Sequence, residues 1–225
     1  GAPGATFTDL INSSTFQIND DGDMVFRAKL QGGSVSSVND FGIWYRPGGS
    51  SILSLVAREG DAAPGTDGVF SFVDIPTQSD VASGEVYFKT IITGGTTTIF
   101  NNNALYGYIG GTLTLIHREG DVTPVLPIGA SGPLSTSTYG DFTADPMVSA
   151  DGKLIFSANI YNVPSRRNEV LFIRDSGTTT ALLQEDTPLP NAGGAPTSAL
   201  ISKFTAYSVN NSSEIIVRVG LRFNI

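Results

Sequence analysis

The sequence contains no cysteine, and His117 is its only histidine. Disulfide bridges and zinc sites built from cysteine and histidine are therefore excluded. Only 15% of the 225 residues are charged, and the net charge is -8. A nucleic-acid backbone or an anionic membrane requires a basic surface, so we expect neither as a partner.

Long hydrophobic runs are also missing. Apolar stretches such as residues 52–57 fall far short of the roughly 20 residues that cross a bilayer, so we expect no membrane insertion. The first ten residues lack the basic and apolar pattern of a signal peptide, and we expect that Gly1 is not the start of the gene product. The low charge and the abundance of Thr, Ser, Asn and Gly are typical of secreted bacterial β-proteins, which predicts an extracellular or cell-surface location.

The chain is instead rich in turn residues, with 26 glycines and 12 prolines, and 40% of it is hydrophobic. It is too apolar for a disordered tail and lacks the composition of a helical bundle. We therefore expect an all-β fold of short strands joined by many turns.

A sequence repeat dominates the chain. The turn motif of residues 58–65 recurs 60 residues later, and a worn third copy covers residues 184–188. Its defining residues are Arg58, Glu59, Gly60, Asp61 and Pro64 in the first copy and Arg118, Glu119, Gly120, Asp121 and Pro124 in the second. Upstream of each copy, a turn leads into a strand with an anchor residue: Phe26, Phe88, Phe156 and, in a fourth unit, Val217.

Each unit is predicted to contain four antiparallel strands. The first strand is expected at residues 14–18, with weaker equivalents at 70–75, 146–149 and 204–209, and the second carries the anchor. The third is an aromatic strand at 41–45, 104–108 and 169–173, and the fourth follows a glycine hairpin at 52–57, 113–117 and 179–183.

The repeats divide one domain, residues 1–225, into units 6–69, 70–131 and 132–196 and a partial unit 197–225. Four-stranded units at this period are typical of a β-propeller-like array of blades. The period exceeds that of the familiar blade families, and the surplus falls in loops such as 31–40 and 94–103.

These residues resemble an uncharacterised family of secreted bacterial repeat proteins, whose units end in Arg-Glu-Gly-Asp-x-x-Pro-Gly and look like β-propeller blades. The resemblance covers nearly the whole chain and rests on residues 58–65 and 118–124. It implies a secreted all-β protein, often carrying a C-terminal anchoring tag, and it implies no catalytic residue. The third copy departs from the pattern because it lacks both Arg and Gly.

The partial unit offers only the first two strands of a blade. The outer edge of its second strand, with Ile215, Val217, Val219 and Leu221, would then lack a partner. Either the residues continue in a longer polypeptide, which we favour, or the edge pairs with another chain, giving a homo-oligomer or polymer.

The repeated acidic pairs are the strongest candidate for a metal site. Glu59 with Asp61, and Glu119 with Asp121, could supply oxygen ligands to Ca²⁺. We favour a structural turn, in which Asp accepts backbone hydrogen bonds and Glu pairs with the neighbouring Arg, because Ca²⁺ needs six to eight oxygens. No other cofactor is indicated.

We therefore expect a noncatalytic, secreted or cell-surface module that binds an unknown protein or glycan through loops, or that serves as a scaffold. Two alternatives are a subunit of an extracellular filament or layer assembled by strand addition, and an extracellular glycan hydrolase or lyase using carboxylate pairs.

Overall fold

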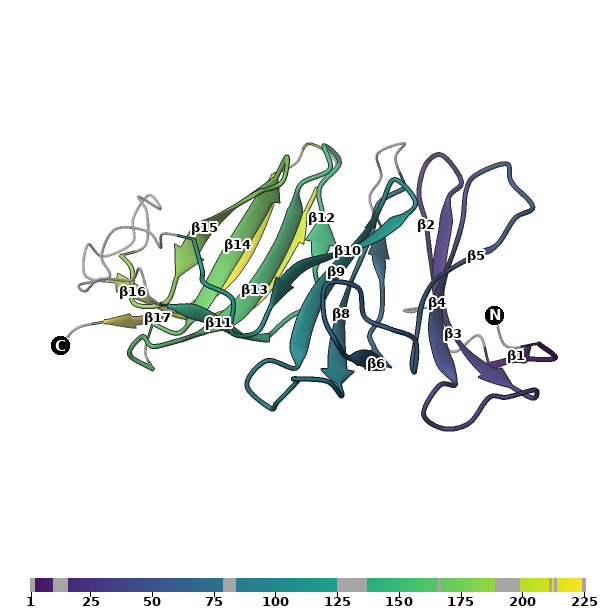
Figure 1. Cartoon of the computed structure of the whole chain (residues 1–225). Coiled ribbons are helices and arrows are strands. Elements are labelled where there is room, and N and C mark those ends of the chain that lie inside the picture. The colour runs from purple at the N-terminus through teal and green to yellow at the C-terminus, as the bar shows by residue number, and fades with distance from the viewer. Residues whose placement is uncertain are drawn as a thin grey trace. The chain divides into compact units, whose positions relative to one another are not determined.

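The computed structural model describes residues 3–9, 16–78, 84–124, 137–165, 167–188, 199–210, 212 and 214–223. Its regular elements in these ranges are all β-strands (Figure 1). No helix in the described part of the chain has the length and apolarity needed to span a bilayer. Two compact units, Gly1–Glu119 and Gly120–Ile225, are described separately.

The first unit contains two antiparallel sheets with the same strand order. In the first sheet, β3 (Met24–Gln31) pairs with β4 (Phe41–Arg46), which pairs with β5 (Ser54–Arg58), while β1 (Thr6–Asp9) and β2 (Phe16–Ile18) pair with the two ends of β3. The second sheet repeats this order with β6 (Val69–Val73), β7 (Thr77–Gln78), β8 (Val86–Thr93), β9 (Asn103–Ile109) and β10 (Thr112–Arg118).

The second unit contains a third sheet of the same order and a shorter sheet. The third sheet consists of β11 (Thr138–Phe142), β12 (Met147–Val148), β13 (Leu154–Tyr161), β14 (Glu169–Asp175) and β15 (Thr178–Gln184). The last two strands, β16 (Ala199–Val209) and β17 (Ile215–Phe223), pair with each other. The expected all-β fold of repeated blade-like antiparallel sheets is confirmed.

The first strand of each complete sheet differs from the expectation, because it is split into two short strands. Residues 70–75 were expected to be the equivalent of residues 14–18. Instead, β6 pairs with the C-terminal end of β8, whereas β7 pairs with its N-terminal end, just as β2 pairs with the N-terminal end of β3. Pro76 and Pro146 lie in the gaps of the second and third sheets. Since proline has no amide hydrogen, it cannot continue the ladder there.

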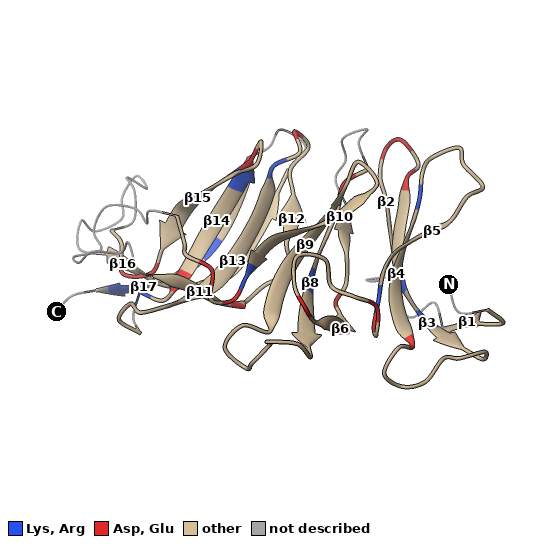
Figure 2. Ribbon diagram, viewed as in Figure 1, with Lys and Arg blue, Asp and Glu red and all other residues tan. Residues whose placement is uncertain are grey.

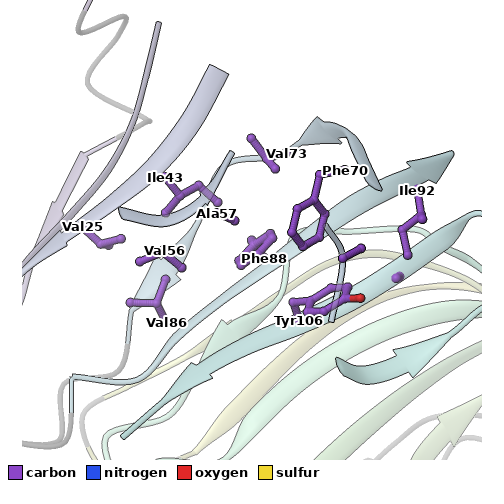
Figure 3. Packing of buried hydrophobic residues seen from close by; sticks show 12 residues of the cluster. Val25, Ile43, Val56, Ala57, Phe70, Val73, Val86, Phe88, Ile92 and Tyr106 are labelled. Carbon is purple, nitrogen blue, oxygen red and sulfur yellow. The ribbon is translucent and has the colours of Figure 1, made fainter. Parts of the chain in front are cut away.

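The core of the first unit lies between its two sheets (Figure 3). Val25 and Ile43 of the first sheet pack in one cluster with Phe70, Phe88 and Tyr106 of the second. The alternation of apolar residues along β3, β4, β8 and β9 turns these side chains inward. This cluster therefore joins two repeats, whereas a second cluster, around Phe26 and Trp44, lies within the first sheet.

Each of the three phenylalanine anchors stacks on the aromatic residue opposite it in the next strand. Phe26 stacks on Trp44, Phe88 on Tyr106 and Phe156 on Phe172, with ring centroids 6.0, 5.9 and 5.2 Å apart. Each pair is also a register pair of the ladder. The repeated aromatic pairs therefore fix how the second and third strands of each sheet align.

Candidate functional site

The repeated acidic turn ends the last strand of a sheet and pairs with the next strand. In the first copy, Glu59 donates its backbone N–H to the Phe41 carbonyl at 3.0 Å, and Gly60 donates to the Phe70 carbonyl at 2.7 Å. In the third copy, Glu185 donates to the Glu169 carbonyl. The turn therefore has a backbone role wherever it occurs.

The glutamate carboxylates of this turn cap the start of the aromatic strand. Glu119 Oε2 accepts hydrogen bonds from the backbone amides of Asn102 at 3.1 Å and Asn103 at 3.2 Å, and Glu185 Oε2 accepts one from Glu169 at 3.1 Å. These two glutamates are 2% and 9% exposed. Because buried amides need acceptors, each carboxylate satisfies the strand beside it.

Glu59 occupies the same position in the first copy, and its surroundings change its acidity. Burial raises the pKa of Glu59, against the opposing effects of hydrogen bonds from the backbone amides of Phe41 and Val73 and of the charge of Arg27. Burial likewise raises the pKa of Glu185. Both carboxylates thus face backbone amides rather than solvent.

The expected ion pair between Glu59 and its neighbour Arg58 is wrong. Arg58 Nη2 contacts Asp61 Oδ1 at 3.2 Å instead. Consecutive residues of an extended chain point to opposite sides, which sends the Glu59 carboxylate into the sheet and the Arg58 side chain toward the turn.

The calcium hypothesis gains no support from this geometry. Binding Ca²⁺ through Glu59 or Glu119 would cost the amide hydrogen bonds these carboxylates accept. Asp61 and Asp121 lie two residues further along the turn. In the described ranges, no group of three or more His, Asp or Glu side chains is placed to hold a metal ion.

The worn third copy keeps the backbone shape of the motif despite its substitutions. Gln184 Nε2 donates to the Arg167 carbonyl at 2.9 Å, as Arg118 Nε donates to the Asn101 carbonyl at 2.6 Å. Asp186 stands where the other copies have glycine and has φ = 66°, against 82° for Gly60. The carboxylate of Asp186 accepts from Arg167 Nε at 2.8 Å and from Arg222 Nη2, which offsets the strain of this left-handed conformation.

We expect Asp186→Asn to lower the free energy of unfolding of the second unit by about 1–3 kcal/mol. The negative charge is lost, and the single Asn oxygen can accept from only one of the two arginines, while Asn still tolerates positive φ. Although burial acts to raise it, the two arginines hold the pKa of Asp186 below its ordinary value of 3.8. The stabilisation is therefore present above about pH 4 and lost as the pH falls through the lower folded-state pKa. Urea unfolding followed by circular dichroism should show a smaller difference from the wild type at pH 3 than at pH 7. An equal difference at both values would contradict this role.

Two loops of the first unit have the same structure and carry exposed apolar side chains. They join β3 to β4 and β8 to β9, where the surplus residues were expected. Each begins with two glycines in the left-handed region: Gly32 and Gly33 at 80° and 57°, and Gly94 and Gly95 at 82° and 57°. Any other residue would be strained there, so these glycines set the path of the loop.

Side-chain hydrogen bonds fix the rest of each loop. Ser36 donates its backbone N–H to Asn39 Oδ1 at 2.7 Å, and Thr98 donates to Asn101 Oδ1 at 2.6 Å. Thr96 is also held by Asp67 through backbone and hydroxyl bonds of 2.8 and 3.0 Å. These bonds hold the loop backbone in one conformation.

The second loop is further held by the repeated turn. Arg118 donates through Nη2 to Thr97 Oγ1 at 3.0 Å as well as to the Asn101 carbonyl. At the loop tips, Val38, Ile99 and Phe100 are 71%, 75% and 68% exposed. We define these three residues as the loop-tip residues. Sequence analysis located the loops, but not which side chains the turn leaves exposed.

The model of a family of unknown function, DUF7453, matches residues 18–224. The chain belongs to the DUF7453 family. No curated protein matches the sequence of this DUF7453 chain.

A solved structure of the GH93 α-L-arabinofuranosidase of Fusarium graminearum with arabinobiose is similar, with a TM-score of 0.37 and 11% identity. The match covers 90% of the DUF7453 chain and 56% of that chain. The DUF7453 chain thus spans about half the length of that structure, and a likeness of this extent carries no argument about fold or activity.

The DUF7453 chain also has a charged cluster in its first unit that sequence analysis missed. It consists of Arg27, Lys29, Lys89, Asp40, Glu59 and Asp74. Lys29 Nζ lies 3.2 Å from Asp40, Lys89 Nζ lies 3.6 Å from Asp74, and the Arg27 guanidinium lies 4.1 Å from the centre of the Phe41 ring. Burial lowers the pKa of Arg27, against the raising effect of the nearby carboxylates.

The three positive and three negative side chains of this cluster give it a net charge of about zero. Figure 2 shows acidic and basic residues on neighbouring strands of the first unit. The cluster joins β3 to the beginning of the second sheet, since Asp74 directly follows β6. The sequence pattern that could have predicted this cluster is the pair Arg27 and Lys29, which are two residues apart and therefore lie on one face of β3. The cluster is therefore better suited to holding two sheets together than to attracting a charged ligand.

Proposed function

We propose that this DUF7453 chain is a noncatalytic, secreted or cell-surface β-repeat module that binds a protein ligand through its loop-tip residues. The observation that carries the proposal is the exposure of Val38, Ile99 and Phe100 on loops of fixed shape. Exposed apolar side chains on a rigid backbone lose little conformational entropy on binding and are typical of interaction sites.

A protein ligand fits these side chains better than a glycan. Aliphatic and phenyl groups offer no hydrogen bond to sugar hydroxyls, whereas they fill apolar pockets at protein interfaces. The noncatalytic part of the proposal is supported by the use of Glu59, Glu119 and Glu185 as acceptors for backbone amides. Carboxylates engaged in this way are poorly placed for acid–base chemistry on a substrate.

The test is binding of the full chain to an array of cell-surface ectodomains, with a glycan array in parallel. For a protein that binds, we expect the double variant Ile99→Ser with Phe100→Ser to weaken binding at least tenfold, the loss expected for removing one or two central apolar contacts. Ile52→Ser is the matched control, because Ile52 is equally exposed, at 70%, but lies outside these loops.

Unchanged affinity of the double variant would overturn the loop-tip site. Turnover of any glycan by the wild-type chain would overturn the noncatalytic proposal and favour the hydrolase or lyase. Retention of the melting temperature in both serine variants shows that a loss of affinity does not come from unfolding.

A further inference from the structure

The first residue of the acidic turn is tied to the neighbouring loop in two copies of the motif. In the second copy, Arg118 donates through Nε to the Asn101 carbonyl at 2.6 Å and through Nη2 to Thr97 Oγ1 at 3.0 Å. In the third copy, Gln184 Nε2 donates to the matching loop carbonyl, that of Arg167, at 2.9 Å. Each bond fastens the loop before the aromatic strand to the turn after the last strand.

The equivalent arginine of the first copy does not make these bonds. Arg58 Nε and Nη1 are buried and have no hydrogen-bond partner within the described ranges, and Nη2 contacts Asp61. The carbonyl that corresponds to that of Asn101 belongs to Asn39. This residue lies beside the turn, since a Cβ at Gly60 would be 3.1 Å from Asn39 Cβ. Buried N–H groups without an acceptor cost free energy, so a hydrogen bond from Arg58 to this carbonyl is favourable.

One difference between the two loops of the first unit accounts for this. Val35 and Thr97 occupy the same position, and each donates its backbone N–H to the carbonyl of the first glycine of its loop. The valine side chain offers no acceptor to an arginine, and it packs against the cluster around Trp44 within the first sheet. The guanidinium of Arg58 therefore lacks the second contact that orients Arg118 toward its loop.

We propose that the first loop, residues 32–40, closes onto Arg58 when a protein ligand packs on Val38. In the closed position the Asn39 carbonyl accepts a hydrogen bond from Arg58 Nε, as the second loop already does from Arg118. The inference rests on the proposed function for its ligand, whereas the two positions of the loop belong to the chain itself. A ligand that binds the closed position more tightly shifts the population toward it.

The first loop has the parts that such a movement requires. Gly32 and Gly33 form its beginning, and glycine changes its backbone dihedral angles with little strain. The tip keeps its shape, because Ser36 donates its backbone N–H to Asn39 Oδ1. The second loop, already tied to Arg118, presents its loop-tip residues in a preformed arrangement. The site thus has a fixed half and an adjustable half.

Hydrogen exchange in the free chain tests the attachment of the loops without a ligand. The amides of Asn39 and Asn101 make equivalent bonds, to the carbonyls of Ser36 and Thr98 at 3.1 and 3.2 Å. After correction for intrinsic rates, NMR should show the Asn39 amide exchanging about tenfold faster than that of Asn101, because only the second loop is tied to its arginine.

Val35→Thr supplies the missing hydroxyl acceptor and is the decisive variant. It should slow exchange of the Asn39 amide by about threefold or more, and the gain should vanish in the double variant Val35→Thr with Arg58→Met. Arg58→Met alone is the control. It should change this exchange by no more than about twofold, because the bond is not made in the free chain. The melting temperature of each variant separates loop effects from unfolding.

Binding measures how the ligand acts on the loop. The probe is the ectodomain that binds most tightly on the array. Val35→Thr should tighten its binding about threefold, because less of the binding free energy is spent on closing the loop. Arg58→Met should weaken binding about threefold or more and should cancel the gain from Val35→Thr.

Three results would overturn the closure. They are equal exchange of the Asn39 and Asn101 amides in the wild type, a slowing by Val35→Thr that persists without Arg58, and an ectodomain affinity that neither variant changes. The last result leaves the proposed function intact. If no ectodomain binds, the proposed function and the ligand-driven closure both fail, while exchange in the free chain still decides whether the loop has its second position.

Discussion

Phe88→Ala is expected to destabilise the first unit by about 3–5 kcal/mol, the loss typical of removing a buried phenyl ring. Phe88 is fully buried, stacks on Tyr106 and meets the edge of Phe70 at a centroid distance of 6.2 Å. Because the core lies between two sheets, the cavity would weaken both of them (Figure 3). Trp44, the single tryptophan, lies in the same unit, so urea unfolding followed by its fluorescence reports this change.

Phe100→Ala is the matched control for this measurement. It removes the same side chain from the same unit, but Phe100 is 68% exposed, so the expected change is within about 0.5 kcal/mol. Similar losses of unfolding free energy in the two variants would show that the core shared by the two sheets does not determine the stability of the unit. A loss confined to Phe88→Ala would show that this core does determine it.

Glu119→Ala is the second substitution with a large expected effect, a loss of about 2–4 kcal/mol. It removes the buried acceptor of the Asn102 and Asn103 amides, which are themselves only partly buried. The same loss should loosen the start of β9, whose first residue is Asn103. Hydrogen exchange at the Asn102 and Asn103 amides, measured with urea unfolding, checks both consequences.

Glu119→Gln separates hydrogen bonding from charge. The glutamine carbonyl oxygen can take the place of Oε2 and accept both amide hydrogen bonds without a charge, so we expect a loss of roughly half that of alanine. Asp20→Ala removes an exposed carboxylate from the same unit and should change the stability by no more than about 0.5 kcal/mol. If Glu119→Ala resembled Asp20→Ala, the capping role would be wrong.

The repeat and the strand order could be predicted from the sequence because they recur. The anchors Phe26, Phe88 and Phe156 mark the same place in three sheets, and their aromatic partners lie in the next strand. The split first strand could not be predicted, because β2, β7 and β12 are two or three residues long. Strands of that length show no measurable alternation.

The candidate site was predictable only in part. The loops were visible as extra residues between strands, and the acidic turn was visible as a repeated motif. The hydrogen bonds of Glu119 were not, because Asn102 and Asn103 precede it by 17 and 16 residues and meet it only when β9 and β10 pair. The left-handed conformation of Asp186 was equally hidden, since it depends on Arg167 and on the distant Arg222.

The interrupted first strands also bear on how this chain avoids aggregation. In the second and third sheets, the gaps around Pro76 and Pro146 and the bulges in β6 and β11 break the outer edge into pieces too short and irregular to recruit a neighbouring molecule. Unintended assembly during folding or storage should therefore not begin at the outer edges of these two sheets.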